Sequence, residues 1–177
     1  MRRPVLLGGS EGLRTSSVVA WWVFTWVPVV VCVLVLSGES TDTFSSAHTA
    51  GWLRHLAEAL LGPIHQISWD NANFAVRKTG HFIGYGLVGL SWFRAWLLTW
   101  QPMFSRRTAS TWRAYAASMA IFCTLVCATA DEVHQTYIPS RTGLVTDACL
   151  DTVGAVTMML LVSSLWLRGR SKPPAAN

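Results

Sequence analysis

The sequence reads Asp-Glu-Val-His-Gln-Thr-Tyr-Ile-Pro-Ser-Arg from Asp131 to Arg141, between two apolar runs long enough to enter a lipid bilayer. Together with Asp147 and Asp151, this segment holds four of the nine acidic residues of the chain. An ionisable side chain at the centre of a membrane helix costs roughly 2.5–3.5 kcal/mol on insertion scales. A cluster of such groups beside two spans therefore predicts a functional site at one end of a membrane bundle.

The composition of the whole chain also favours a membrane protein. Of the 177 residues, 51% are hydrophobic and 13% are charged, whereas about a quarter of the residues of a soluble domain are charged. The net charge of +5 does not predict nucleic-acid binding, because the basic residues stand at the ends of apolar runs. No CxxC or cysteine–histidine ligand spacing occurs, so neither a disulfide framework nor a zinc site is expected of the four cysteines: Cys32, Cys123, Cys127 and Cys149.

Four runs are long enough to cross a bilayer, which takes about 20 residues. The first covers residues 15–38 and is uncharged, and the others cover roughly residues 77–100, 112–130 and 145–167. A signal peptide is an alternative interpretation of the first run, because two arginines follow Met1. That run, however, is longer than the usual apolar region of about 7–15 residues and no A-x-A cleavage site follows it.

We therefore predict an all-α integral membrane bundle of four transmembrane helices. This membrane domain spans residues 18–167, between an N-terminal segment, residues 1–17, and a C-terminal tail, residues 168–177, that is expected to be disordered.

The basic residues predict the orientation of this bundle. With four spans, nine basic residues and one acid fall on one side, and four basic residues and eight acids fall on the other. Cytoplasmic loops carry the excess of Lys and Arg, so both termini are predicted to be cytoplasmic and the polar segment extracytoplasmic. Tryptophans also favour membrane interfaces, and five fall at the predicted cytoplasmic one: Trp21, Trp22, Trp100, Trp112 and Trp166.

The segment between the first two spans, residues 39–73, is predicted to lie outside the cell. Apolar residues recur there at helical spacing, at Leu53, Leu56, Ala57, Leu60 and Leu61, and the pattern stops at Gly62-Pro63. This pattern predicts a short amphipathic helix lying on the outer face of the membrane. A helix packed on the rim of the bundle is the alternative.

The four-span topology brings polar residues of three helices to the same extracytoplasmic end. We expect eight of them to converge in one pocket: Lys78, His81, Asp131, Glu132, Gln135, Arg141, Asp147 and Asp151. Tyr85 follows Lys78 and His81 on one face of the second span. Glycines would let the helices approach closely at Gly80, Gly84, Gly86, Gly89 and Gly154.

The residue types in this pocket limit its chemistry. Lys78 and Arg141 suit an anionic group such as a phosphate or carboxylate. The further ligand-binding candidates are His81, Tyr85 and Gln135. If the protein is an enzyme, the acid–base candidates are His81, Asp131, Glu132, Asp147 and Asp151. The sequence points to no definite cofactor, and Asp147 and Asp151 are the candidates to bind a divalent cation. Asp151, one turn inside the bundle, needs a partner in Arg141, Lys78 or His81, or else a proton or a metal.

These residues resemble the VanZ-like family. The family pattern has a Lys-x-x-His-Phe-x-x-Tyr helix start, an Asp-Glu-x-x-Gln-x-x-x-Pro-x-Arg segment, and an aspartate followed by a polar residue four positions on and a glycine. The matching residues here are Lys78, His81, Phe82, Tyr85, Asp131, Glu132, Gln135, Pro139, Arg141, Asp147, Asp151 and Gly154. The resemblance extends over about residues 18–165. It departs from the family at Asp151, where other members often carry asparagine.

The resemblance implies a multi-pass protein of the bacterial cytoplasmic membrane, in the setting of the cell envelope. The namesake of the family is associated with resistance to the glycopeptide antibiotic teicoplanin. The first hypothesis is a protein that binds or modulates an anionic lipid, a lipid-linked envelope intermediate or a glycopeptide. The second is an enzyme acting on a lipid-linked or phosphorylated substrate, with or without a metal. The third is a structural membrane subunit whose salt bridges lock the helices together.

Overall fold

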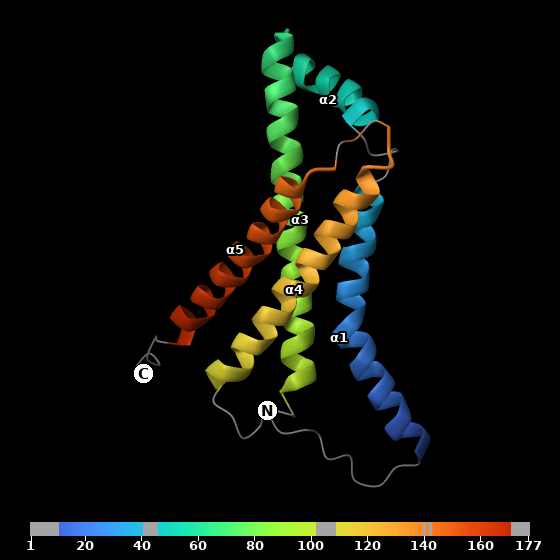
Figure 1. The fold of residues 1–177 in the computed structure, drawn as a ribbon, viewed down its shortest axis with the longest axis vertical. Helices are drawn as coiled ribbons and strands as arrows, with labels where there is room; N and C mark the ends of the chain where they lie inside the picture. Colours follow the sequence, from blue (N-terminus) through green and yellow to red (C-terminus); the bar gives the residue numbers. More distant parts are fainter. Residues whose placement is uncertain (1–10, 41–45, 102–108, 140, 142, 171–177) are drawn as a thin grey trace.

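The structure is a computed structural model that describes the backbone of residues 11–40, 46–101, 109–139, 141 and 143–170. Within these ranges it describes the side chains except those of residues 11–16, 46–49, 109 and 166–170. The described part forms five helices (Figure 1): α1 (Glu11–Glu39), α2 (Ser46–Leu61), α3 (Gln66–Trp100), α4 (Ala109–Gln135) and α5 (Val145–Arg170). The predicted all-α fold is thus confirmed, while the predicted terminal segments lie largely outside the described residues.

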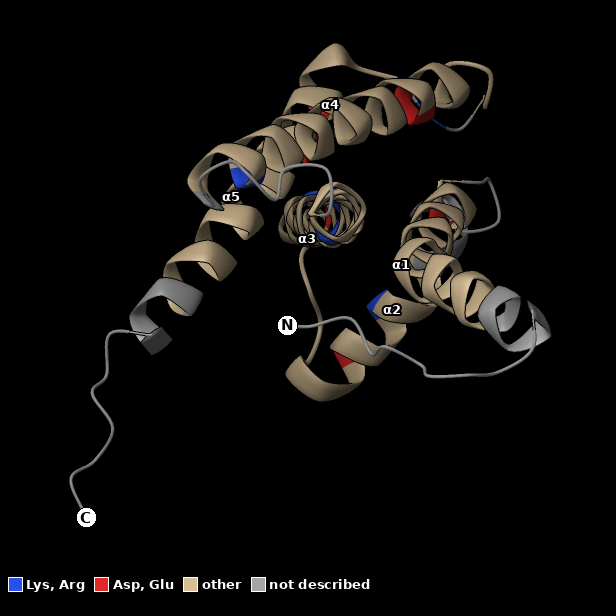
Figure 2. Ribbon diagram, turned by 90° about the horizontal axis from the view of Figure 1, so that it is seen from below, with Lys and Arg blue, Asp and Glu red and all other residues tan. Residues whose placement is uncertain are grey.

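The long helix α3 is the axis of the fold. It has 35 residues, about 52 Å at 1.5 Å per residue. Seen along its axis, α4 and α5 lie on one side of it and α1 on the other (Figure 2). The end of α1, the end of α4 and the start of α5 lie beside one another along α3, which continues beyond them together with α2 (Figure 1).

Three helices are long and apolar enough to cross a membrane: Ser17–Glu39, Ser110–Gln135 and Val145–Leu165. The fourth predicted span, residues 77–100, lies within α3, which does not meet that standard of length and composition among the described residues. The physical reason is its position. A helix packed against α1, α4 and α5 turns much of its surface to protein instead of lipid, so it carries glycines and polar side chains that a lipid-facing helix avoids.

Glycines allow α3 and α5 to approach closely. A Cβ atom added at Gly154 would lie 2.3 Å from the carbonyl oxygen of Phe82, and one added at Gly89 would lie 2.4 Å from the Cβ of Ala155. Gly86 faces Met158 and the backbone of Gly154 in the same contact. Of the predicted close-packing glycines, Gly80 differs, because nothing lies within 4 Å of its added Cβ. We call this α3–α5 contact the seam.

Tryptophan rings join α1 to α3 in the half of the bundle away from the polar segment. Trp26 meets Trp92 and Trp96 edge to face, with ring centroids 5.9 and 5.2 Å apart. Arg94 of α3 donates to the carbonyl oxygens of Phe24 and Thr25 at 3.0 and 3.3 Å. Arg94 thereby ties α3 to the backbone of α1.

Helix α2 ends where the sequence predicts, at Leu61, because Gly62 takes a positive φ of 84° and turns the chain. It leans against the first turns of α3 beyond the ends of the other helices (Figure 1). Arg54 fixes this hairpin, donating to Glu58 Oε1 at 2.8 Å, to the Ile64 carbonyl oxygen at 3.1 Å and to Gln66 Oε1. Arg54 thus ties the end of α2 to the start of α3, while the apolar side chains of Trp52, Leu56, Leu60 and Leu61 are exposed.

Candidate functional site

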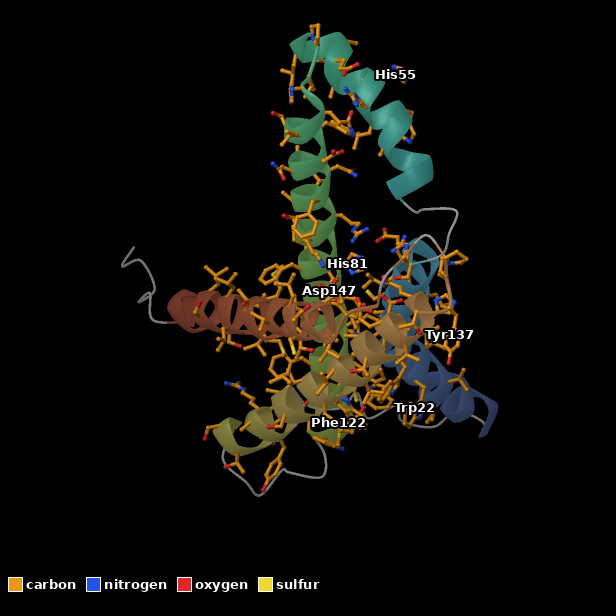
Figure 3. The ribbon with its side chains drawn as sticks, turned by 45° about the horizontal axis from the view of Figure 1, so that its top comes forward. Trp22, His55, His81, Phe122, Tyr137 and Asp147 are labelled. Carbon is orange, nitrogen blue, oxygen red and sulfur yellow. The ribbon has the colours of Figure 1, made fainter. Side chains whose placement is uncertain are left out.

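Two ion pairs join α3 to α5 at the polar end of the seam. Lys78 Nζ pairs with Asp147 Oδ2, and His81 Nδ1 lies 3.6 Å from Asp151 Oδ2. His81 and Asp147 lie where the two helices cross (Figure 3). The two pairs lie one above the other because their residues are about one helical turn apart on each helix. Lys78 and His81 are three residues apart on α3, and Asp147 and Asp151 are four residues apart on α5. The sequence spacing alone accounts for this register once the helices are in contact.

Asp151 is the most deeply buried ionisable side chain of the site. It is 1% exposed, and neither of its carboxylate oxygens accepts a hydrogen bond from the described part of the chain. A buried carboxylate without hydrogen bonds is costly, and a charged partner offsets the cost. His81, with a side chain 18% exposed, is the partner that the structure supplies.

The end of α4 closes the site from the other side. Glu132 is buried and its Oε2 accepts a hydrogen bond of 2.8 Å from the backbone N–H of Leu144, just before α5 begins. Gly143 lies against the Glu132 carbonyl oxygen, where an added Cβ would come within 2.1 Å. The connection between α4 and α5 is therefore held tightly to the end of α4.

These side chains surround a small hollow between α3, α4 and α5, which we call the polar hollow. Its volume of about 10 Å³ suits about one water molecule. Two basic and three acidic side chains line it, so their net charge is −1 when His81 is neutral and zero when His81 is protonated. The lining residues are Arg77, Lys78, His81, Glu132, Gln135, Asp147, Leu150 and Asp151.

A larger cavity lies on the other face of the α3–α4 contact, toward α1. It has a volume of about 460 Å³ and is mainly apolar, with polar side chains near one end. It exists because α1 and α4 both pack on α3 but do not pack against each other along their length. We call it the groove, and its lining residues are Val33, Leu36, Ser37, Tyr85, Val88, Cys127, Ala130, Asp131 and His134.

Two polar contacts bridge α1 to the α4 end of the molecule beside the groove. Ser40 is fully buried and its hydroxyl donates to Asp131 Oδ2 at 2.8 Å. Arg141 Nη2 donates to the backbone carbonyl oxygen of Glu39 at 2.9 Å. Gln135 Nε2 also donates to Asp131 Oδ2, at 3.0 Å. Asp131 is thus held in place at the polar end of the groove.

A model of the VanZ/LLP1 family matches residues 18–167, which is 150 of the 177 residues. The chain belongs to the VanZ/LLP1 family. With three helices that could span a membrane, the chain fits a VanZ-like membrane protein. No curated protein and no solved structure matches it.

The structure divides the predicted site of this VanZ/LLP1 protein between the two cavities. Six of the predicted residues line the polar hollow: Lys78, His81, Glu132, Gln135, Asp147 and Asp151. Asp131 and Tyr85 line the groove instead, and Arg141 lines neither cavity. The expectation that these residues form a single pocket was wrong because neighbouring residues of one helix point in different directions. Successive residues of a helix point about 100° apart, so Asp131 and Glu132 face different neighbours.

Sequence reasoning missed two polar residues that the structure brings to these cavities. Arg77 lines the polar hollow and forms no ion pair with any described residue. Ser40 bridges to Asp131 across 91 positions of sequence. A signal for Arg77 was present in its position next to Lys78 at the start of a polar helix face. No local signal exists for Ser40, because its partner is fixed by tertiary packing.

The predicted divalent-cation site finds little support in the arrangement of the described side chains. No group of three or more His, Cys, Asp or Glu residues among them is placed to hold a metal ion. Asp147 faces the cation of Lys78, and Asp151 faces His81.

Proposed function

We propose that this protein binds an amphiphilic molecule of the cell envelope at the extracytoplasmic end of a membrane bundle. The candidates are an anionic lipid, a lipid-linked envelope intermediate and a glycopeptide antibiotic. One observation carries the proposal: an apolar groove of about 460 Å³ ends at a cluster of polar side chains. Ligand pockets commonly have volumes of about 300–1,000 Å³ and are mostly apolar with a few well-placed polar groups.

We include in this proposal four spans of the bacterial cytoplasmic membrane. Three of them are α1, α4 and α5, and the remaining one is the part of α3 that packs against these helices. The nine-to-four asymmetry of the basic residues supports cytoplasmic termini. The ends of α1 and α4 and the start of α5 would then meet near the outer surface. About 12 residues of α3, from Gln66 to Arg77, would rise roughly 18 Å above that level with α2.

The groove suits the hydrocarbon part of such a ligand. It lies between two helices, α1 and α4, that are apolar enough to span a membrane. Both helices also expose large apolar side chains such as Val30, Leu34, Phe122 and Val126. A chain could pass from the lipid into the groove between them without leaving an apolar environment, while its headgroup stays at the polar end. Burial of apolar surface would supply most of the binding free energy.

An anionic part of the headgroup would have to extend past the end of the α3–α4 contact to approach Arg77 and Lys78, because the polar hollow has room for only about one water molecule. Lys78 is engaged by Asp147, so an anion would have to compete with that carboxylate. Arg77 has no ion pair within the described part of the chain and is the first candidate. Arg141, which we expected to hold the anion directly, donates to the Glu39 carbonyl oxygen. Arg141 would instead contribute to binding by joining the end of α1 to the segment that follows α4, beside the groove.

The neighbouring residues Thr129 and Ala130 of α4 allow a direct test. Both have small side chains and are exposed, and of the two Ala130 lines the groove. We expect Ala130→Trp to fill the groove and to lose the lipids or lipid-linked molecules that co-purify with the wild-type protein, as identified by mass spectrometry. Thr129→Trp adds the same ring outside the groove lining and should retain them. Equal retention by both variants would refute the proposal, as would a wild-type protein without bound amphiphile.

A second candidate function, an enzyme acting on the bound amphiphile, is favoured by the His81–Asp151 pair. A carboxylate beside Nδ1 of a histidine orients the ring and leaves Nε2 to act as a base or an acid. The pair lies beside a hollow with room for about one water molecule. Conversion of a co-purified amphiphile by the wild-type protein but not by His81→Gln, with equal binding by both, would support an enzyme. Unchanged ligand in both proteins would leave binding as the function.

A further inference from the structure

The structure also bears on which headgroup the groove accepts. We infer that the groove selects an amphiphile whose headgroup presents hydrogen-bond donors, hydroxyl or ammonium groups, to the Asp131 carboxylate. This inference rests on the proposed binding function of the groove and adds the chemistry of the group next to the hydrocarbon chain.

The charge of the groove favours a headgroup with hydrogen-bond donors. Asp131 is the one acidic residue in its lining, and neither Lys nor Arg is among the described residues that line it. The neighbouring polar residues, Ser37 and His134, are exposed. A phosphate at this end would lie close to a carboxylate, with His134 as the one basic side chain among the described lining residues and no Lys or Arg there. Like charges at such distances repel strongly where water is scarce.

The hydrogen bonds that hold Asp131 also favour a donor on the ligand. Ser40 and Gln135 both donate to its Oδ2, at 2.8 and 3.0 Å. Tyr85, which lines the same groove, is the other side chain near enough to donate to this carboxylate, and no further hydrogen bond to the Asp131 side chain is made within the described part of the chain. A carboxylate fixed through one oxygen, with capacity left on the other, is prepared to accept a donor from a ligand. Hydrogen bonds to a charged acceptor are about twice as strong as neutral ones.

The basic side chains of the polar hollow and the Asp131 carboxylate of the groove lie on different sides of the α3–α4 contact. Arg77 and Lys78 line the polar hollow on the α5 side, whereas Asp131 lines the groove on the α1 side. The contact between α3 and α4 stands between them, with His81 and Tyr85 on α3 at a centroid distance of 6.2 Å. An anionic group would therefore be attracted toward the Arg77 side of this contact and away from Asp131. The group attached to the chain itself would meet Asp131.

Cys127 offers a reporter for this inference because it lines the groove. A protein with Cys32, Cys123 and Cys149 replaced by alanine keeps this single thiol, and its rate of alkylation by N-ethylmaleimide measures access to the groove. The full chain is placed in phosphatidylcholine nanodiscs, since the choline headgroup has no N–H donor. Four probes with the same dodecyl chain are added: dodecyl glucoside, dodecylamine, dodecyltrimethylammonium and dodecyl phosphate.

We expect dodecyl glucoside, dodecylamine or both to protect Cys127 at a concentration about tenfold lower than dodecyl phosphate does. The Asp131→Asn variant should remove this preference, whereas Asp70→Asn, a matched change at an exposed position of α3, should preserve it. Protection by the glucoside alone would identify a hydroxyl-bearing headgroup, and protection by the amine alone an ammonium headgroup. Either result supports the inference.

Other outcomes overturn the inference. If dodecyltrimethylammonium protects as well as dodecylamine, charge and not hydrogen bonding decides the selection. If dodecyl phosphate protects equally well, Asp131 does not select the headgroup, although the proposed function survives. If no probe protects Cys127 at all, the proposed function itself fails.

A second variant covers the case in which Asp131→Asn does not fold. Ser40→Ala keeps the carboxylate and removes one of its two donors. It should leave the order of the four probes unchanged. A reversed order in this variant would show that the bridge, and not the carboxylate, sets the preference.

Discussion

The α3–α5 seam and the space between α1 and α4 show how one helix can support both a closed and an open side. On the seam, glycines bring backbones into contact, and two ion pairs cross at the polar end. On the opposite side, α1 and α4 are bridged near one end by Ser40–Asp131 and by Arg141–Glu39, and the groove lies between them.

The difference has a simple physical cause. Where small residues face each other, backbones approach and leave no room for a ligand. Where Val, Leu and Tyr side chains face a neighbour across a gap, they leave a cavity that lipid or ligand can fill. The closed seam thus gives the molecule its rigidity, and the open side gives it a place to bind. The following predictions test that division of roles.

The largest effect is expected at the centre of the seam. In Gly154→Ala, the new Cβ would lie 2.3 Å from the Phe82 carbonyl oxygen, so the helices must separate. We expect a loss of about 1–3 kcal/mol in the free energy of unfolding, measured by thermal unfolding in detergent. Gly80→Ala is the matched control, because its Cβ meets nothing within 4 Å. Equal stability of the two variants would show that the seam is not tightly packed.

A smaller effect is expected at the buried acid of the seam. Asp151→Ala removes the partner of His81 and leaves a cavity, so the free energy of unfolding should fall by about 1–2 kcal/mol. Asp151→Asn keeps the shape and a hydrogen-bonding group without the buried charge, and it should be close to the wild type. Thermal unfolding of the three proteins provides the measurement. An alanine variant as stable as the wild type would mean that the His81–Asp151 contact adds nothing to the stability of the seam.

The smallest effect is expected at the hydrogen bond between Ser40 and Asp131, beside the groove. Ser40→Ala removes one hydrogen bond to Asp131, which is worth about 0.5–1.5 kcal/mol. Because this bond ties α1 to α4, we also expect faster alkylation of Cys127 in the single-cysteine protein. Ser68→Ala is the control, since Ser68 is exposed on α3 and lines neither cavity. Equal alkylation rates in both variants would show that the bridge does not limit access to the groove.

The sequence predicted much of this organisation because its signals are local. Apolar runs marked the helices, and Gly62 marked the end of α2. The spacing of Lys78 with His81 and of Asp147 with Asp151 predicted faces that meet, and the ion pairs join them as that spacing allows. The expectation that Asp151 needs a charged neighbour led to three candidates, of which the structure places His81 closest.

Other expectations failed because they depended on how helices are placed in space. The start of α3 at Gln66, 11 residues before the predicted span, is not marked by any change to a more apolar sequence. The position of α2 on α3 depends on Arg54 reaching Gln66 and the Ile64 carbonyl oxygen. The separation of Asp131 from Glu132 required knowing which helix lies on each side of α4.

The sequence by itself determined the class of the protein, its helices, its polar end and its family, because hydrophobicity, helical spacing and a specific polar pattern are properties of short segments. Only the tertiary structure decided that the polar residues serve two cavities instead of one pocket. It also decided that α1 stands apart from α4 and leaves a groove, and that Ser40 meets Asp131. Those outcomes depend on the order in which helices pack around α3, and that order is set by the summed contacts of residues far apart in the chain.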